Sequence, residues 1–159
     1  PKAHFAGYAK HARSHIQAAL DLEPENPWAH AMLGAWNMEI VRKGGRFLAR
    51  TMYGAKLDEG IRLYRRALEL DSKNPVLQYE FGLALAAQDA KKYRADAIRQ
   101  VTTALSLPPK NAFERLAKAR AQLLLNALNS GKNAELRAVI TAQTEFPRAA
   151  QPASFPQKR

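Results

Sequence analysis

Two histidines offer the first place in this sequence to look for chemistry. His11 and His15 lie four positions apart, and on a helix this spacing puts two imidazoles on one face, where they can chelate zinc or nickel. The segment reads His-Ala-Arg-Ser-His, so it lacks the glutamate that follows the first histidine of a zinc-protease helix. The pair flanks an apolar helical face, which favours a solvated helix side over a metal site, and we keep the metal site as the weaker alternative.

The other arrangements that could support catalysis are incomplete. Asp58 and Glu59 are adjacent, so on a helix they point about 100° apart and cannot share a substrate. Gly44 and Gly45 have neither the preceding strand nor the following Lys-Ser/Thr of a phosphate-binding loop. The chain has no cysteine, which excludes a thiol nucleophile and disulfides. The sequence therefore predicts a protein that is not an enzyme and holds no cofactor.

The length and net charge of the chain limit its domain organisation and its partners. The 159 residues fit one domain of ordinary size, and the formal net charge is +11. Residues 1–43 carry 5 basic and 4 acidic side chains, whereas residues 96–159 carry 10 and 4. This excess favours a solvated basic surface, with an acidic protein partner, nucleic acid or anionic lipid as alternatives. Tyr93, beside Lys91, Lys92 and Arg94, is the main aromatic among the basic clusters, so nucleic acid is the less favoured partner.

Membrane and targeting signals are weak. No run of about 18 uncharged apolar residues occurs, so we expect no transmembrane helix. The chain starts at Pro1 rather than Met, from which we expect a processed product or an excised piece that has lost an export signal or never had one. A cysteine-free chain suits reducing and oxidising compartments alike. Both a soluble cytoplasmic and a bacterial periplasmic location therefore stay open.

Three Ala/Leu-rich segments repeat along the chain, each followed by a polar turn. They align on Ala19, Ala67 and Ala104, with spacings of 48 and 37 residues. Asn26 and Asn74 each precede a proline, which is typical of a helix N-cap followed by proline in the first helical position. No segment alternates strictly between apolar and polar residues as a half-buried strand does. The pattern predicts an all-α chain with helices over about 3–22, 27–42, 56–71, 75–88, 92–107, 112–129 and 134–145.

The repeating residues resemble those of the tetratricopeptide repeat family, in its bacterial type. Leu33-Gly34 and Phe81-Gly82 match the motif of the family's first helix. The matching small residues, large residues and turn prolines elsewhere are Ala12, Ala19, Pro24, Gly60, Tyr64, Ala67, Ala97, Ala104 and Pro109. The resemblance implies an α-solenoid of about three and a half antiparallel helical hairpins. It places a single superhelical domain at residues 1–147 and a Pro-rich, disordered tail at 148–159.

An insertion interrupts the first full repeat. The spacing of 48 exceeds the family's repeat of 34 by 14 residues, which fall near residues 41–54. We expect Gly44-Gly45 to break the helix, and the residues after them to form one or two helical turns that end at Gly54. The apolar side chains of this segment are Phe47, Leu48, Met52 and Tyr53. They predict packing over the solenoid, and partner binding is the alternative.

The resemblance also implies a function. The first helix of each hairpin would line a concave face, on which the apolar row could hold a partner's peptide or helix. The members of that row are Trp28, Ala31, Met38, Tyr79, Leu83, Phe113, Leu116 and Arg120. We predict a protein-protein interaction scaffold, with burial of the row in the core as the competing interpretation. An electrostatic binder of nucleic acid or of an anionic membrane surface is the alternative function, and self-association through the N-terminal helix or the insertion is a further prediction.

Overall fold

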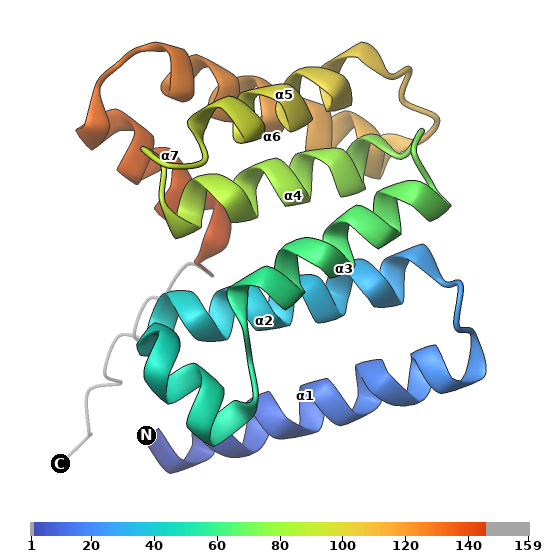
Figure 1. Cartoon of the computed structure of the whole chain (residues 1–159). Helices are drawn as coiled ribbons and strands as arrows, with labels where there is room; N and C mark the ends of the chain where they lie inside the picture. Colours follow the sequence, from blue (N-terminus) through green and yellow to red (C-terminus); the bar gives the residue numbers. More distant parts are fainter. Residues whose placement is uncertain (1, 146–159) are drawn as a thin grey trace, which may run out of the picture.

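The computed structural model describes residues 2–145, with side chains from Gly7 onward, so the predicted tail at 148–159 lies outside the described residues. Over this range the chain is all-helical, as the sequence predicts, with seven α-helices, one π-helical turn and no strand (Figure 1). The elements are α1 (Lys2–Leu22), α2 (Pro27–Leu48), η1 (Ala49–Tyr53), α3 (Leu57–Leu70), α4 (Pro75–Gln88), α5 (Arg94–Ser106), α6 (Ala112–Asn129) and α7 (Asn133–Thr144).

Asparagine caps set the starts of three helices. The side-chain oxygen of Asn26 accepts a hydrogen bond from the backbone N–H of Ala29 at 3.1 Å. Asn74 caps α4 in the same way, and Asn111 accepts from the N–H of Glu114 at 2.8 Å. These bonds satisfy backbone donors that have no partner inside the helix. The predicted N-caps at Asn26 and Asn74 are therefore confirmed, and Asn111 is a third.

Consecutive helices lie side by side along the stack from α1 to α6 (Figure 1). The most extensive contacts join α2 with α3 and α4 with α5, which form two hairpins. Helix α4 also contacts both α2 and α6 across these hairpins, and α7 packs on α6 and α4. The second and fourth helices consequently face α7 across the same side of the molecule.

Glycines let the helices of each hairpin approach closely. A Cβ atom at Gly34 would lie 2.9 Å from the carbonyl oxygen of Gly60, and one at Gly60 would lie 2.6 Å from the Cγ of Met38. In the second hairpin, a Cβ atom at Gly82 would lie 2.7 Å from a methyl carbon of Val101. Such approaches exclude any side chain. The motif glycines therefore mark the points where α2 crosses α3 and α4 crosses α5.

The first helix packs differently from its sequence counterparts. Ala9 and Leu20 are buried against α2, and the indole N–H of Trp36 donates to the carbonyl of Ala9 at 2.8 Å. Ala12 and Ala19 are exposed, although the residues they match in α3 and α5 are fully buried. The sequence match of these two alanines therefore does not extend to their packing in the described residues. Helix α2 covers Ala9 and Leu20 but leaves Ala12 and Ala19 exposed, so self-association through the N-terminal helix stays a prediction.

The predicted helix break in the insertion is confirmed. Gly45 leaves helical geometry with φ +74°, and Gly54 ends η1 with φ +66°. Both values favour glycine, because side chains with a Cβ rarely adopt this region. Between them the chain forms a short helical segment that lies beside α1 and returns to begin α3 (Figure 1).

The apolar stripe of this insertion faces outward rather than over the stack. Phe47 is 82% exposed and Met52 is 53% exposed. Leu48 is also exposed, and only Tyr53 is half-buried. Ala49 and Ala55, with no exposed surface, make the packing contacts instead. The expectation that the larger side chains cover the stack is wrong, because small alanines allow the backbone itself to approach α2.

Replacing the glycine at the first crossing tests the close approach. We expect Gly34→Ala to lower the free energy of unfolding by about 1–3 kcal/mol, because the new methyl meets the backbone of α3. Gly44→Ala is the matched control, since its nearest neighbouring atom would be 3.8 Å away. Alanine is the better helix former, so the control should be as stable as the parent or more so. Urea unfolding followed by circular dichroism measures both, and equal stabilities would contradict the close crossing.

Candidate partner-binding cleft

The predicted concave row does not form one continuous surface. Four of its members are buried, with exposed fractions of 6% or less, and they are Ala31, Met38, Tyr79 and Leu83. Trp28, Phe113 and Leu116 are exposed, and Arg120 is half-buried. The middle of the row is therefore core, as the competing interpretation expected, and the ends remain at the surface.

Helix α7 covers the middle of the row. The guanidinium of Arg120 donates to the carbonyl of Gln143 at 2.8 Å, and the Gln143 amide donates to the carbonyl of Arg120 at 3.0 Å. The Tyr79 hydroxyl donates to the side-chain oxygen of Gln143 at 3.1 Å. Arg120 also lies 5.7 Å from the centre of the Tyr79 ring. Arg120, which we predicted to line an open groove, instead holds α7 in place.

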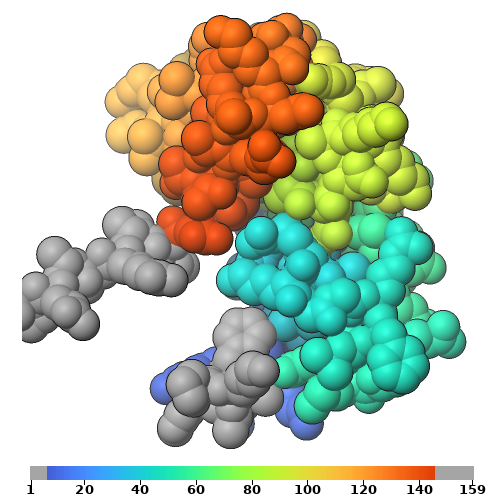
Figure 2. Space-filling model, turned by 90° about the vertical axis from the view of Figure 1, so that its left-hand side faces the viewer, coloured from blue at the N-terminus to red at the C-terminus, as the bar shows by residue number. Residues whose placement is uncertain are grey.

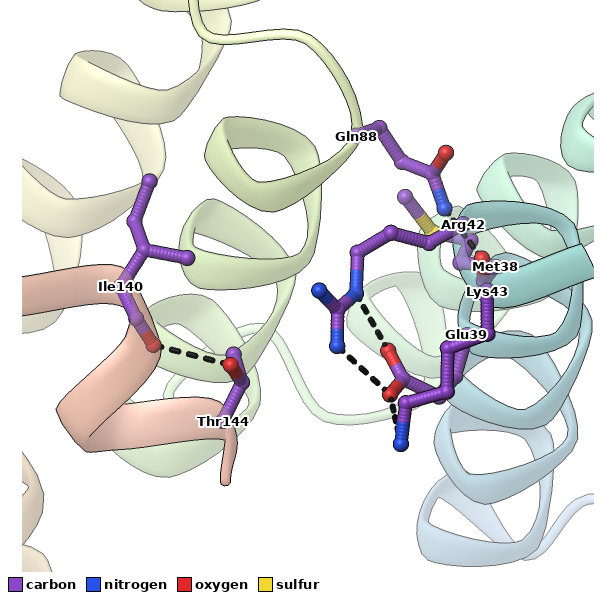
Figure 3. Close-up of polar contacts among 7 residues, drawn as sticks. All are labelled: Met38, Glu39, Arg42, Lys43, Gln88, Ile140 and Thr144. Carbon is purple, nitrogen blue, oxygen red and sulfur yellow. Dashed lines mark hydrogen bonds and ion pairs between the residues drawn. The ribbon is translucent and has the colours of Figure 1, made fainter. Parts of the chain in front are cut away.

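A smaller cleft remains between α2, α4 and α7. Its volume is about 230 Å³. Ala35, Met38, Leu83, Ala84 and Ala87 form its apolar lining. Glu39, Arg42, Tyr64, Glu80, Gln88, Gln143 and Thr144 supply its polar atoms. Figure 3 shows α7, with Ile140 and Thr144, facing the α2 residues across this space. In Figure 2 the orange-red surface of α7 meets the cyan surface of α2 on the same face.

Charged residues of α2 form one edge of the cleft. Glu39 accepts two hydrogen bonds of 2.7 Å from Arg42 and pairs with Lys43 at 2.9 Å (Figure 3). Burial alone would raise the pKa of Glu39, but the hydrogen bonds from Arg42 and Lys43 outweigh it and hold the pKa below its usual range. Gln88 of α4 donates to the backbone carbonyl of Met38 and joins the two helices. This edge is therefore internally paired.

The opposite wall carries a carboxylate that sequence reasoning missed. Glu80 is the single acidic residue of α4 and lies half-buried in the cleft. Burial raises the pKa of Glu80, and the attraction of Arg120 offsets this shift only in part. None of the described residues forms a hydrogen bond or ion pair with it. One signal was available: Glu80 is the single charged residue of α4.

Comparison with known families identifies the relatives of this chain. A family model described as "Regulator of microtubule dynamics protein 1-3", or RMD1-3, matches residues 7–129. The chain belongs to this family. No curated protein and no solved structure matches it.

The predicted membership of the tetratricopeptide repeat family is therefore wrong, since the matching model is RMD1-3 and no tetratricopeptide family was found. The physical reason lies in the motif itself. Small residues such as Gly34 and Gly82 are required wherever two helices cross closely. Turn prolines and asparagine caps serve any short connection between helices. The pattern therefore indicates helical hairpins in this RMD1-3 chain, but it does not identify the family.

The remaining chemical candidates do not converge on a site. His11 and His15 are both exposed. The described part of the RMD1-3 chain contains no group of three or more histidine or acidic side chains able to hold a metal ion. Glu59 pairs with Arg62 at 2.6 Å. Among the described helices, none combines the length and apolar character required to cross a bilayer.

The raised pKa of Glu80 makes stability depend on pH. In the folded chain the charged form is disfavoured, so a stability cost develops as pH rises above the unfolded value of 4.5 and is complete above the raised pKa. Glu80→Gln should therefore increase the free energy of unfolding at pH 7, and the gain should vanish below pH 4.5. Glu135→Gln is the matched control and should bring no gain, because its carboxylate lies in the favourable first turn of α7. Urea titrations across this pH range measure the effect, and a gain that persists at low pH would refute the assignment.

The Gln143 side chain should control how firmly α7 is held. Gln143→Ala removes its bonds to Tyr79 and Arg120, at a cost of about 1 kcal/mol each. We expect faster amide hydrogen exchange in α7, with α2 and α3 unchanged. Gln122→Ala, which removes only a surface bond to Asn126, is the control. Unaltered exchange in α7 would mean that other contacts fix this helix.

Proposed function

We propose that this RMD1-3 family member is a non-enzymatic protein-binding adaptor that holds part of a partner in the cleft between α2, α4 and α7. The observation that carries this proposal is Glu80, a half-buried carboxylate that forms no hydrogen bond or ion pair with the described residues and lies on the wall of a cleft with a mixed apolar and polar lining. A cationic side chain from a partner would relieve the cost of its burial. The aliphatic part of a lysine or arginine would contact Leu83 and Ala84.

The size of the cleft supports an anchor residue rather than a substrate. Small-molecule sites usually measure about 300–1,000 Å³, and this cleft has about 230 Å³. It therefore suits one or two side chains of a bound peptide or helix. Trp28, Phe113 and Leu116 remain exposed at the ends of the predicted row, where they stay predicted contacts for the flanking parts of such a partner.

The arrangement of the helices is consistent with an adaptor. Hairpins α2–α3 and α4–α5 follow one another in chain order, and α2, α4 and α6 contact in sequence. This order supports a short α-solenoid, an architecture in which neighbouring units build an extended binding surface. The family is described as a regulator of microtubule dynamics, so microtubules are the most concrete class of partner.

Filling the cleft tests this proposal. Ala84→Phe places a large side chain among the lining residues, and Ala138→Phe places the same side chain on the exposed surface of α7. We expect the first variant to weaken cosedimentation with purified microtubules about tenfold, and the second to leave it unchanged. Circular dichroism confirms that both are folded.

Salt separates this proposal from the electrostatic alternative. Binding to an anionic polymer or membrane falls steeply with the logarithm of salt concentration, as counterion release requires for nucleic acid. Cleft binding should persist at raised salt and should depend on Ala84. If the parent does not cosediment, or if Ala84→Phe binds as well as Ala138→Phe, then the cleft does not hold this partner.

A further inference from the structure

A recess beside the insertion gathers more positive than negative charge. It lies between the end of α2, η1, the start of α3 and the turn before α5, with a volume of about 560 Å³. Its basic lining residues are Arg46, Arg50, Lys56 and Lys92. Asp58 is the single acidic residue of the lining. The recess therefore has four cationic side chains for one carboxylate.

These cations differ from most basic residues around them. On the same part of the chain, Glu39 pairs with Arg42 and Lys43, and Glu59 pairs with Arg62. Within the described residues, Arg46 and Arg50 form no hydrogen bond or ion pair through their side chains. The same holds for Lys56, while the ammonium of Lys92 lies over the Tyr93 ring at 4.9 Å. Because like charges gathered at one recess repel each other, an anion placed there would be stabilised.

The insertion holds two of these cations in a defined place. Ala49 and Ala55 are completely buried, and the N–H of Ala55 donates to the carbonyl of Ala49 at 3.0 Å. The guanidinium of Arg13 in α1 donates to the carbonyl of Tyr53 at 2.8 Å. This support keeps Arg46 and Arg50, which are four positions apart, on one side of the helical segment.

The start of α3 is fixed to the same support. The N–H of Lys56 donates to the side-chain oxygen of Asn37 at 3.0 Å, and Asn37 in turn donates to the carbonyl of Leu33. Asn37 is 5% exposed, so its amide is a buried connection between α2 and α3. The basic side chains from the insertion and from α3 are thus brought together by ordered backbone.

Apolar side chains define what kind of anion would fit. Val41, Leu57, Ile61 and Tyr93 complete the wall of the recess. Arginine binds carboxylates through two parallel hydrogen bonds, and the apolar wall can take an aliphatic side chain. A short peptide with carboxylate and aliphatic side chains would contact both the basic residues and the apolar wall. A phosphate backbone would contact the basic residues alone.

We infer that the recess bounded by Arg46, Arg50, Lys56 and Lys92 is a docking site for an acidic segment of a partner protein, in which glutamate or aspartate residues alternate with aliphatic ones. The concave form of the site favours a protruding segment over a flat membrane surface. This site is separate from the cleft that contains Glu80, and no residue is shared between the two linings.

Peptide binding to the full chain tests the inference. The probe is a fluorescein-labelled peptide of alternating glutamate and leucine, followed by fluorescence anisotropy. We expect Arg46→Glu/Arg50→Glu to weaken its binding about tenfold or more. Lys92→Glu, on a different element, should also weaken it. Arg115→Glu/Arg137→Glu changes the net charge equally with exposed residues of α6 and α7, and it should bind like the parent.

Two further probes separate the outcomes. A peptide of alternating glutamate and serine should bind more weakly than the leucine peptide, because it leaves the apolar wall unused. Vesicles that contain phosphatidylserine should bind less tightly than the peptide and without dependence on Arg46. The inference is overturned if the two double variants weaken peptide binding equally, if the leucine peptide does not bind, or if vesicle binding alone depends on Arg46 and Arg50. Microtubule cosedimentation of Arg46→Glu/Arg50→Glu is a separate readout, so the cleft proposal can fail or stand independently.

Discussion

The close crossing of paired helices is the constraint on which this fold depends. At Gly34 and Gly60 the backbones of α2 and α3 come within the distance that a single Cβ atom would occupy, and Gly82 allows the same between α4 and α5. Large side chains next to these glycines, such as Tyr64 and Phe81, then stack at 4.9 Å between ring centres. The tight hairpins bring α2 and α4 to one side, where α7 can cover them and leave the small cleft.

Local signals made most of the helices predictable from the sequence. Asparagine caps, prolines in the first turn and glycines with positive φ act within a few residues of where they occur, so their effects can be identified without a fold. The cleft depends on contacts that join distant positions. Tyr79 and Gln143 are 64 residues apart, and no pattern in the sequence indicates that they meet. Burial of Tyr79 and Leu83, and the use of Arg120 to hold α7, therefore could not be predicted from periodicity.

The family correction shows what a packing motif can and cannot establish. The residues that suggested tetratricopeptide repeats do lie at helix crossings, yet the chain belongs to RMD1-3. A motif made of small residues describes how helices touch, and unrelated families can meet that requirement with the same amino acids. The exposed Ala12 and Ala19 illustrate the point, because their sequence matches buried positions while their surroundings do not. Function is better argued from Glu80 and the basic recess, where burial and the excess of like charge carry an electrostatic cost.

The two glycines that bracket the insertion have a consequence for variation of this protein. Gly45 and Gly54 take up the changes of chain direction, and Ala49, Tyr53 and Ala55 connect the segment to the rest. Most of its outward side chains contribute little to folding, so they can change without cost to the helical stack. The residues between Gly45 and Gly54 can therefore be exchanged while the packing of the helices stays the same. Sequences grafted between these glycines, with both alanines retained, would give the same scaffold a different specificity.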